Sequence, residues 1–257
     1  MSTLAVIPAR LGATRLPQKP IRLLGGAPLV VRVWERVVAM NVADQVVVAT
    51  DSDVVARVCL ERGADVTLTR EDHVSGTDRV AEVASQRAYA DFSVLLNVQG
   101  DEPWVAAEAV RGALALVGEG RCPVGTAAVR IHPDNVDEVL AAPSVVKVVV
   151  NDAGRALYFS RAAIPFLRDV ADAAVRAGLA RQHIGVYAYT RAALAQWVAL
   201  PQHPLEITER LEQLRPLAAG VPIGVATIEG DASGGIDTED DLALANARWT
   251  AQNEDDS

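Results

Sequence analysis

The chain alternates short apolar runs with longer stretches in which apolar residues recur every three or four positions. In the first half the runs are rich in Val, Ile and Leu without a polar face, which is typical of strands buried in a parallel sheet. They predict strands at Leu4–Pro8, Gln45–Thr50, Val66–Leu68 and Ser93–Val98. The stretches between them predict helices at about 28–41, 52–63, 76–90 and 105–118. This order indicates an α/β fold, with an open, mostly parallel sheet and helices on both faces.

The second half has a less regular pattern. It predicts helices at about 191–199, 204–219 and 239–251, and strands at Val124–Val129, Val145–Val150, Arg155–Phe159, Ile184–Tyr189 and Val221–Ile228. A segment at 160–182 has no clear period. Because no linker or internal repeat divides the chain, we expect one domain over residues 1–257, in which the second half extends the same sheet. Residues 252–257 are expected to form a frayed acidic tail.

Composition limits the possible classes of protein. The chain has 257 residues, of which 50% are hydrophobic, so it can bury a large core. We expect no membrane association, because no apolar run reaches spanning length and residues 1–8 are too short for a signal peptide. The cysteines, Cys59 and Cys122, lack metal-ligand spacing and are expected to be buried free thiols, which fits a cytoplasmic protein.

Cationic residues gather near the start of a chain that is otherwise acidic. The net charge of −9 and the pI near 5.0 argue against nucleic-acid binding. Residues 1–34 nevertheless carry +5 and no Asp or Glu, which leaves −14 for the remainder. Arg10, Arg15 and Lys19 lie in one loop after the first predicted strand. The loop is either a solvated surface segment or a site for a polyanion such as a nucleoside triphosphate, whose phosphates Arg and Lys bind. Glycine-rich nucleotide motifs are absent.

Two carboxylates are candidates for a metal site. Asp101 follows a buried strand, at the sheet edge where α/β proteins bind ligands, and could hold Mg²⁺ or simply begin a turn. Asp237 precedes the last predicted helix and could be its N-cap. If Thr238 takes the cap with Asp241 three residues on, Asp237 is left to face a ligand. Asp240 lies three residues after Asp237, so the alternative in which Asp237 itself is the N-cap stays open.

The segment at 73–79 enters a predicted helix. Ser75, Gly76 and Thr77 could present N–H groups and hydroxyls to a base or a phosphate, and Ser75 or Thr77 could equally cap the helix.

In these segments the chain resembles the 3-deoxy-manno-octulosonate cytidylyltransferases, also called CMP-Kdo synthetases. The resemblance extends over about residues 4–245. Its matching segments follow the family order: Pro8–Arg10, Thr14–Pro17, Lys19–Pro20, Ala49–Asp51, His73–Arg79, Asn97–Pro103, Tyr158–Arg161, His183–Tyr187, Leu211–Arg215 and Gly235–Thr238. Each segment alone is modest evidence, but the ordered set is strong.

The resemblance implies a doubly wound, nucleotidyltransferase (GT-A-like) sheet with an added sugar-binding and dimer-forming portion. The CTP-binding half would span about 1–130, the sugar-acid and dimer portion about 131–220, and a strand and helix carrying a metal ligand about 221–251. It further implies Mg²⁺-dependent attack of the anomeric hydroxyl of Kdo on the α-phosphate of CTP, giving CMP-Kdo and pyrophosphate for lipopolysaccharide synthesis. The protein would be a cytoplasmic homodimer.

The resemblance also implies roles for residues. Asp101 and Asp237 would hold Mg²⁺, and Arg10, Arg15 and Lys19 would stabilise the triphosphate and the leaving pyrophosphate. CTP would contact Pro8, Ala9, Arg10, Arg15, Lys19, Ser75, Gly76, Thr77, Arg79 and Asp101. The sugar acid would contact Gln99, Arg161, His183, Tyr187, Glu212 and Gln213.

Other interpretations stay open at this point. From the residues alone, Arg161 could be a surface charge, His183 and Tyr187 could share a half-buried strand face, and Glu212 and Gln213, adjacent on a helix, could meet a pocket only at its edge. A CMP-sialic acid synthetase would share the chemistry, a sugar-1-phosphate nucleotidylyltransferase fits the loop less well, and a nucleotide-binding sensor would not need both aspartates. Ser160 is the one serine near the expected site, and it lacks a His–acid partner set, which fits direct transfer.

Overall fold

The computed structural model describes residues 1–12, 15–166, 168, 175, 178–230, 232 and 234–255. Contacts group these residues into two units. The first unit comprises Ser2–Val105 and Ser233–Ser257, and the second comprises Ala106–Ala232 with Met1. No helix in the described part of the chain is long and apolar enough to cross a membrane. The expectation of a single domain stays a prediction.

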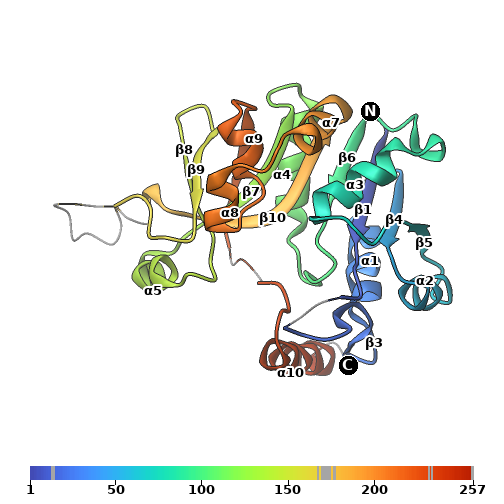
Figure 1. The fold of residues 1–257 in the computed structure, drawn as a ribbon. Coiled ribbons are helices and arrows are strands. Elements are labelled where there is room, and N and C mark those ends of the chain that lie inside the picture. Colours follow the sequence, from blue (N-terminus) through green and yellow to red (C-terminus); the bar gives the residue numbers. More distant parts are fainter. Residues whose placement is uncertain are drawn as a thin grey trace. The chain divides into compact units, whose positions relative to one another are not determined.

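The first unit is built on four parallel strands, in the order β5, β4, β1, β6 (Figure 1). The strands are β1 (Thr3–Pro8), β4 (Gln45–Thr50), β5 (Asp65–Leu68) and β6 (Val94–Asn97). Leu4 to Ile7 in β1 and Val94 to Asn97 in β6 are buried on both faces, as the apolar runs predict.

Helices connect these strands. They are α1 (Leu29–Ala39), α2 (Asp53–Leu60), α3 (Gly76–Ser85) and two short 3₁₀ turns, Lys19–Ile21 and Arg87–Tyr89. The chain moves outward from β1 through α1 and α2, and then returns through α3 to the other side of β1. Because such crossovers are right-handed, α3 covers the face opposite α1 and α2. Ser52 caps α2 by accepting the Val55 N–H.

Two further parts complete the first unit. A small hairpin, β2 (Leu23–Leu24) and β3 (Ala27–Pro28), follows the basic loop and was not predicted. The last helix, α10 (Glu239–Asp255), extends through most of the expected frayed tail, whose final residues 256–257 lie outside the described part.

The second unit mixes parallel and antiparallel pairs. Strand β7 pairs parallel with β11 and antiparallel with β10, and β8 pairs antiparallel with both β10 and β9. The strands are β7 (Val124–Arg130), β8 (Lys147–Val150), β9 (Ala156–Ser160), β10 (Arg181–Thr190) and β11 (Ile223–Ile228). The helices are α4 (Ala107–Gly118), α5 (Val136–Ala141), α7 (Arg191–Ala199), α8 (Pro204–Glu209), α9 (Leu214–Ala218) and the 3₁₀ turn Pro133–Asn135.

The single helix predicted at 204–219 is wrong, because the structure divides it into α8 and α9. Arg210 has φ 53°, a left-handed conformation that ends an α-helix. Pro216 lies in the first turn of α9, where its missing N–H costs nothing. A buried ion pair between Glu206 and Arg215, with N–O distances of 2.8 and 2.5 Å, joins the two helices. The short helix α5 was not predicted, and part of the segment at 160–182 lies outside the described residues.

Candidate active site

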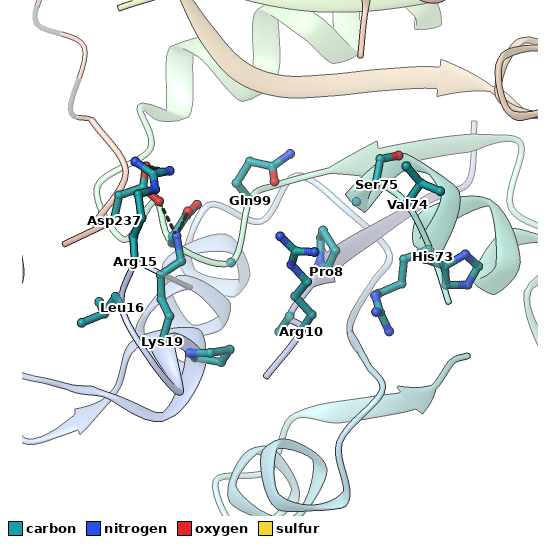
Figure 2. A pocket seen from close by; sticks show the side chains of 16 residues that line it. Pro8, Arg10, Arg15, Leu16, Lys19, His73, Val74, Ser75, Gln99 and Asp237 are labelled. Carbon is teal, nitrogen blue, oxygen red and sulfur yellow. Dashed lines mark hydrogen bonds and ion pairs between the residues drawn. The ribbon is translucent and has the colours of Figure 1, made fainter. Parts of the chain in front are cut away.

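A pocket of about 370 Å³ lies at the carboxyl ends of β1 and β6 in the first unit (Figure 2). Its lining contains most side chains that the sequence predicts for CTP and metal binding. They are Pro8, Ala9, Arg10, Arg15, Lys19, Ser75, Gly76, Arg79, Asp101 and Asp237. Gln99, which was predicted to contact the sugar acid, lies in the same lining. Thr77 is fully buried and is not part of this lining.

The pocket lies at the point where the strand order reverses, because β4 and β6 flank β1 on opposite sides. Open α/β sheets bind ligands at the carboxyl ends of strands at such a switch point. Gly100 allows the segments after the two strands to approach, since a Cβ there would lie 2.7 Å from the carbonyl oxygen of Pro8. The pocket therefore depends on a close backbone contact that other residues would obstruct.

Lys19 lies between the two predicted metal ligands. Its Nζ donates to Oδ2 of Asp101 in a short hydrogen bond and to Oδ1 of Asp237 at 2.8 Å. Arg15 Nη2 lies 2.9 Å from the other oxygen of Asp237. The Lys19 side chain is 17% exposed, whereas that of Arg15 is 67% exposed. Two carboxylates from distant parts of the chain thus converge on one cationic group.

The packing of apolar side chains brings Asp237 to this place. Leu16 of the basic loop is buried in one cluster with Ile236 and with Leu242 of α10. The N–H of Ile236 donates to the carbonyl oxygen of Asp101 at 3.0 Å. Since Ile236 directly precedes Asp237, these contacts hold the second carboxylate beside the first.

Thr238 takes the N-cap of α10, which the sequence left open. Its Oγ1 accepts the N–H of Asp241 at 3.1 Å, and its own N–H donates to Asp241 Oδ2 at 2.9 Å. This reciprocal pair is a capping box. The carboxylate of Asp237 is therefore left to bond with the cations of the basic loop.

The hairpin β2–β3 holds α10 against the loop. Gly25 has φ +54°, and a Cβ at this position would lie 2.2 Å from the ring of Trp249. Its N–H donates to Asn246 Oδ1 at 3.0 Å, and the Arg32 guanidinium lies 4.2 Å from the Trp249 ring centroid. Glycine is required here by both the conformation and the close contact. The tight contact anchors the helix that follows Asp237.

The carboxylates of the pocket change the acidity of their neighbours. Burial alone would lower the pKa of Lys19, but the charges and hydrogen bonds of Asp101 and Asp237 raise it above its ordinary value. Burial, followed by the charge of Asp101, raises the pKa of Glu102 to about 8. Lys19 is therefore protonated and positively charged at neutral pH.

The segment at 73–76 forms one wall of the pocket. Ser75 caps α3: its Oγ accepts the Asp78 N–H at 3.2 Å, and Asp78 Oδ2 accepts the Ser75 N–H at 3.1 Å. The hydroxyl of Ser75 is thus used by the helix cap. The His73 ring, 5% exposed, forms a short hydrogen bond with Glu82, which attaches the segment to α3.

Asp51 is a contributor to which the sequence assigned no role. Its Oδ2 forms a 2.8 Å ion pair with Arg79, and its Oδ1 accepts the N–H of Leu11 at 3.4 Å. It therefore links α3 to the start of the basic loop. Its position in the sequence could have marked it as a site residue, because Asp51 directly follows the predicted strand Gln45–Thr50. Asp101 was chosen as a candidate for the same reason.

The predicted sugar contacts, apart from Gln99, lie in the second unit. Arg161 is partly buried and is not a free surface charge. Its Nε donates to the Glu209 carbonyl at 3.0 Å, and its Nη1 donates to the Pro143 carbonyl at 3.0 Å. The carboxylate of Glu209 accepts the Arg161 N–H at 2.9 Å and the Ser160 hydroxyl at 2.6 Å. The guanidinium is thus oriented by the end of α8 and by the segment that follows α5.

His183 and Tyr187 belong to an aromatic cluster on β10. Their ring centroids lie 5.5 Å apart, and Tyr187 also packs on Trp197. Thr126 Oγ1 donates to the Val186 carbonyl at 2.7 Å, so His183 Nε2, 3.0 Å away, is the donor to Thr126. Burial lowers the pKa of His183 to about 3. The ring is therefore neutral, with its proton on Nε2 and its Nδ1 an acceptor.

Glu212 and Gln213 lie in the turn between α8 and α9, with Gln213 as the N-cap of α9. The expectation that they share a helix about 100° apart is wrong, because Arg210 ends the helix first. Gln213 is buried and Glu212 is partly buried.

The donor set suits magnesium. Asp101 and Asp237 offer hard oxygen atoms to one position, as their shared bond to Lys19 demonstrates. Within the described ranges, no group of three or more His, Cys, Asp or Glu side chains could hold a metal. Mg²⁺ usually keeps several waters and takes one or two carboxylates together with substrate phosphates. Two aspartates fit what Mg²⁺ usually takes from a protein beside substrate phosphates.

Known proteins are similar to this chain over most of its length. A model of the cytidylyltransferase family matches residues 4–223. The 3-deoxy-manno-octulosonate cytidylyltransferase of Gemmatimonas aurantiaca is 63% identical over 97% of this chain and 95% of its own length. That of Herminiimonas arsenicoxydans is 43% identical over 97% of this chain and all of its own.

Solved structures share the fold. A CMP:2-keto-3-deoxy-manno-octonic acid synthetase complexed with CTP matches with a TM-score of 0.87 and 35% identity, over 98% of this chain and 100% of that one. The 4-diphosphocytidyl-2C-methyl-D-erythritol synthase of Anaerococcus prevotii, 12% identical with a TM-score of 0.61 over 97% and 98% of the two chains, resembles it in fold alone.

The fold and the pocket thus define a nucleotidyltransferase, with an α/β architecture and a mixed, mostly parallel sheet. Within that class the sequence identities are decisive, since they extend over almost the whole chain. The chain belongs to the 3-deoxy-manno-octulosonate cytidylyltransferases.

Proposed function

We propose that the pocket of the first unit binds the triphosphate of CTP, and that the protein transfers the CMP group to the sugar acid Kdo for lipopolysaccharide synthesis. The observation that carries the proposal is the convergence of Arg15, Lys19, Asp101 and Asp237 at the carboxyl ends of β1 and β6. Family membership supports the choice of CTP and Kdo over other nucleotides and sugars.

The cations of the basic loop would hold the nucleotide. Arg offers a planar fork to phosphate oxygens, and Lys offers a compact charge. Arg10 is exposed and lies beside Pro8, apart from the Lys19–Asp237 cluster (Figure 2), so it can bind phosphate without losing a bond that the structure records. As the bond from the α-phosphorus to the leaving oxygen breaks, these charges stabilise the pyrophosphate.

Asp101 and Asp237 would hold Mg²⁺. When bound, Mg²⁺ neutralises phosphate charge and lowers the pKa of a nearby hydroxyl. The anomeric hydroxyl of the sugar attacks the α-phosphorus in line, and direct transfer needs no protein nucleophile. Ser160, whose hydroxyl is hydrogen-bonded to Glu209, is consistent with this scheme.

The second unit would recognise the sugar acid. Arg161 has two of its guanidinium nitrogens fixed by carbonyl oxygens, which orients the remaining N–H groups for a carboxylate. His183 would accept a sugar hydroxyl at Nδ1, because Nε2 donates to Thr126. Tyr187, Glu212 and Gln213 would complete the contacts that this unit makes. We further propose that the protein is a cytoplasmic homodimer, which light scattering of the purified protein would test.

A pyrophosphate-release assay tests the function. With CTP and Mg²⁺, we expect release with Kdo, little with sialic acid, and none after chelation by EDTA. Release with sialic acid alone would indicate a CMP-sialic acid synthetase. Tight CTP binding without release for any sugar acid would indicate a nucleotide sensor. An 8-amino form of Kdo, assayed in parallel, would define the sugar preference.

A further inference from the structure

In the pocket, the groups proposed to bind phosphate are bonded to the groups proposed to bind metal. Lys19 bridges Asp101 and Asp237, and Arg15 pairs with Asp237 (Figure 2). Two positive side chains are therefore balanced by two carboxylates. The cluster of these four side chains therefore has no net charge, whereas Arg10 in the same pocket is not part of it.

These pairs cannot persist when both ligands bind. Two of the three N–H donors of Lys19 point at carboxylates, whereas a triphosphate needs them for its own oxygens. The same carboxylate oxygens are the ligands that a divalent cation requires. Binding of nucleotide and metal therefore requires the two sets of ions to exchange partners.

The protein is built so that the cation, and not the carboxylates, moves in this exchange. Asp101 is held by its backbone bond to Ile236, and Asp237 by the capping box that follows it. Lys19 reaches them on a flexible four-carbon stem. The backbone at both aspartates is thus fixed beside the pocket, whereas the ammonium group can move away on its stem.

We propose that Lys19 is an internal counter-ion that occupies the metal position until the triphosphate draws it away, so that nucleotide and divalent cation bind with positive coupling. The proposal rests on the proposed function, because it uses the same carboxylates. The triphosphate draws Lys19 away and frees the carboxylates for the metal, and the metal in turn frees Lys19 for the triphosphate. By linkage, the increase in affinity is the same in both directions, and we expect roughly 10-fold, within the usual range of such coupling.

The direct test measures Mn²⁺ binding to the full-length, metal-free protein without nucleotide, by electron paramagnetic resonance of the free ion. Lys19→Met keeps the apolar stem and removes the charge. We expect this variant to bind Mn²⁺ roughly 10-fold more tightly than the wild type. Arg15→Met should give a smaller gain, since Arg15 is exposed and pairs with only one carboxylate. Arg22→Met is the matched control and should give none, because Arg22 pairs with Glu239 outside the pocket.

The reciprocal test needs no metal. In EDTA, Asp101→Asn should bind CTP more tightly than the wild type, because Lys19 loses one of its carboxylate partners. The Asp101→Asn variant also tests the coupling if Lys19→Met does not fold. Equal or weaker Mn²⁺ binding by folded Lys19→Met, or unchanged CTP binding by Asp101→Asn in EDTA, overturns the coupling and leaves the metal site standing. If neither wild type nor Lys19→Met binds Mn²⁺, the metal site itself fails and the coupling fails with it.

Discussion

The chain has two lysines, Lys19 and Lys147, and the protein uses them in opposite ways. Lys19 in the first unit is partly exposed and bonds to two carboxylates. Lys147 in the second unit is fully buried, and its Nζ donates to the carbonyl oxygens of Ala142, Val145 and Arg161 at 2.9, 2.8 and 2.5 Å. Burial, then the charge of Arg161, lowers the pKa of Lys147, whereas the carboxylates raise that of Lys19.

The difference separates charges that a ligand can displace from charges that belong to the fold. The Lys147 ammonium is fully buried and donates to three carbonyl oxygens, and the carbonyl of Ala142 also accepts the Val145 N–H at 3.2 Å. Removing its charge leaves buried acceptors unsatisfied. The partners of Lys19 are charged and accessible, and each has a competing ligand in the proposed reaction. Substitutions in the two regions should therefore damage different properties.

The largest effect is expected at the pocket. Asp101→Asn should lower kcat on the order of 10³-fold, as loss of a charge that stabilises the transition state does, while CTP binding in Mg²⁺ partly survives. Steady-state pyrophosphate release measures both. Asp240→Asn, an exposed neighbour of Asp237, is the control and should retain activity. Near-normal rates for Asp101→Asn would contradict the metal assignment.

The next effect concerns stability in the other region. Lys147→Met should lower the free energy of unfolding by about 2 kcal/mol or more, since the carbonyls of Val145 and Arg161 lose the Lys147 donor at about 1–3 kcal/mol each, whereas that of Ala142 keeps the Val145 N–H. Urea denaturation measures it, with the exposed Arg121→Met as control. If Lys147→Met leaves stability unchanged but weakens Mg²⁺ or CTP binding, the contrast between the two lysines is lost.

The loop cations should affect CTP more than the sugar. Lys19→Ala should raise KM for CTP by roughly 10- to 100-fold, the range of one charged hydrogen bond, and the more exposed Arg15→Ala by less. KM for the sugar acid should change little in both. Arg22→Ala provides the comparison, and equal losses for both substrates would argue against a triphosphate-specific role.

The effect that is smallest near neutral pH is a pH dependence in the second unit. The pKa of folded His183, about 3, lies below its unfolded value of about 6.5. The unfolded state therefore binds more protons below pH 6.5. Stability from the neutral ring is complete above that pH and is lost as pH falls toward 3, by up to about 1.4 kcal/mol per unit. Urea unfolding at pH 7, 6 and 5 should show less acid sensitivity in His183→Gln than in the wild type or in His132→Gln. Parallel curves for all three would contradict the buried neutral ring.

Local patterns predicted most of the fold. The four central strands and α1 to α4 lie close to the predicted ranges, because buried parallel strands and amphipathic helices leave strong signals. The helix at 204–219 was mispredicted because its apolar period continues across Arg210, where the chain turns left-handed and the Glu206 carbonyl accepts the Leu211 N–H at 3.2 Å. The hairpin β2–β3 is too short to leave a pattern.

In the candidate site, too, some features could be predicted from the sequence and others could not. The sequence alone establishes the cationic loop after β1, the carboxylate after β6 and, by resemblance, the family, because strand ends and charge runs are local features. It does not establish that Asp237 meets Asp101, that Thr238 takes the cap, or that Lys19 lies between the carboxylates. Those facts depend on Leu16, Ile236 and Trp249 packing together from both ends of the chain. Such contacts arise from shape and burial in three dimensions, which no local pattern encodes.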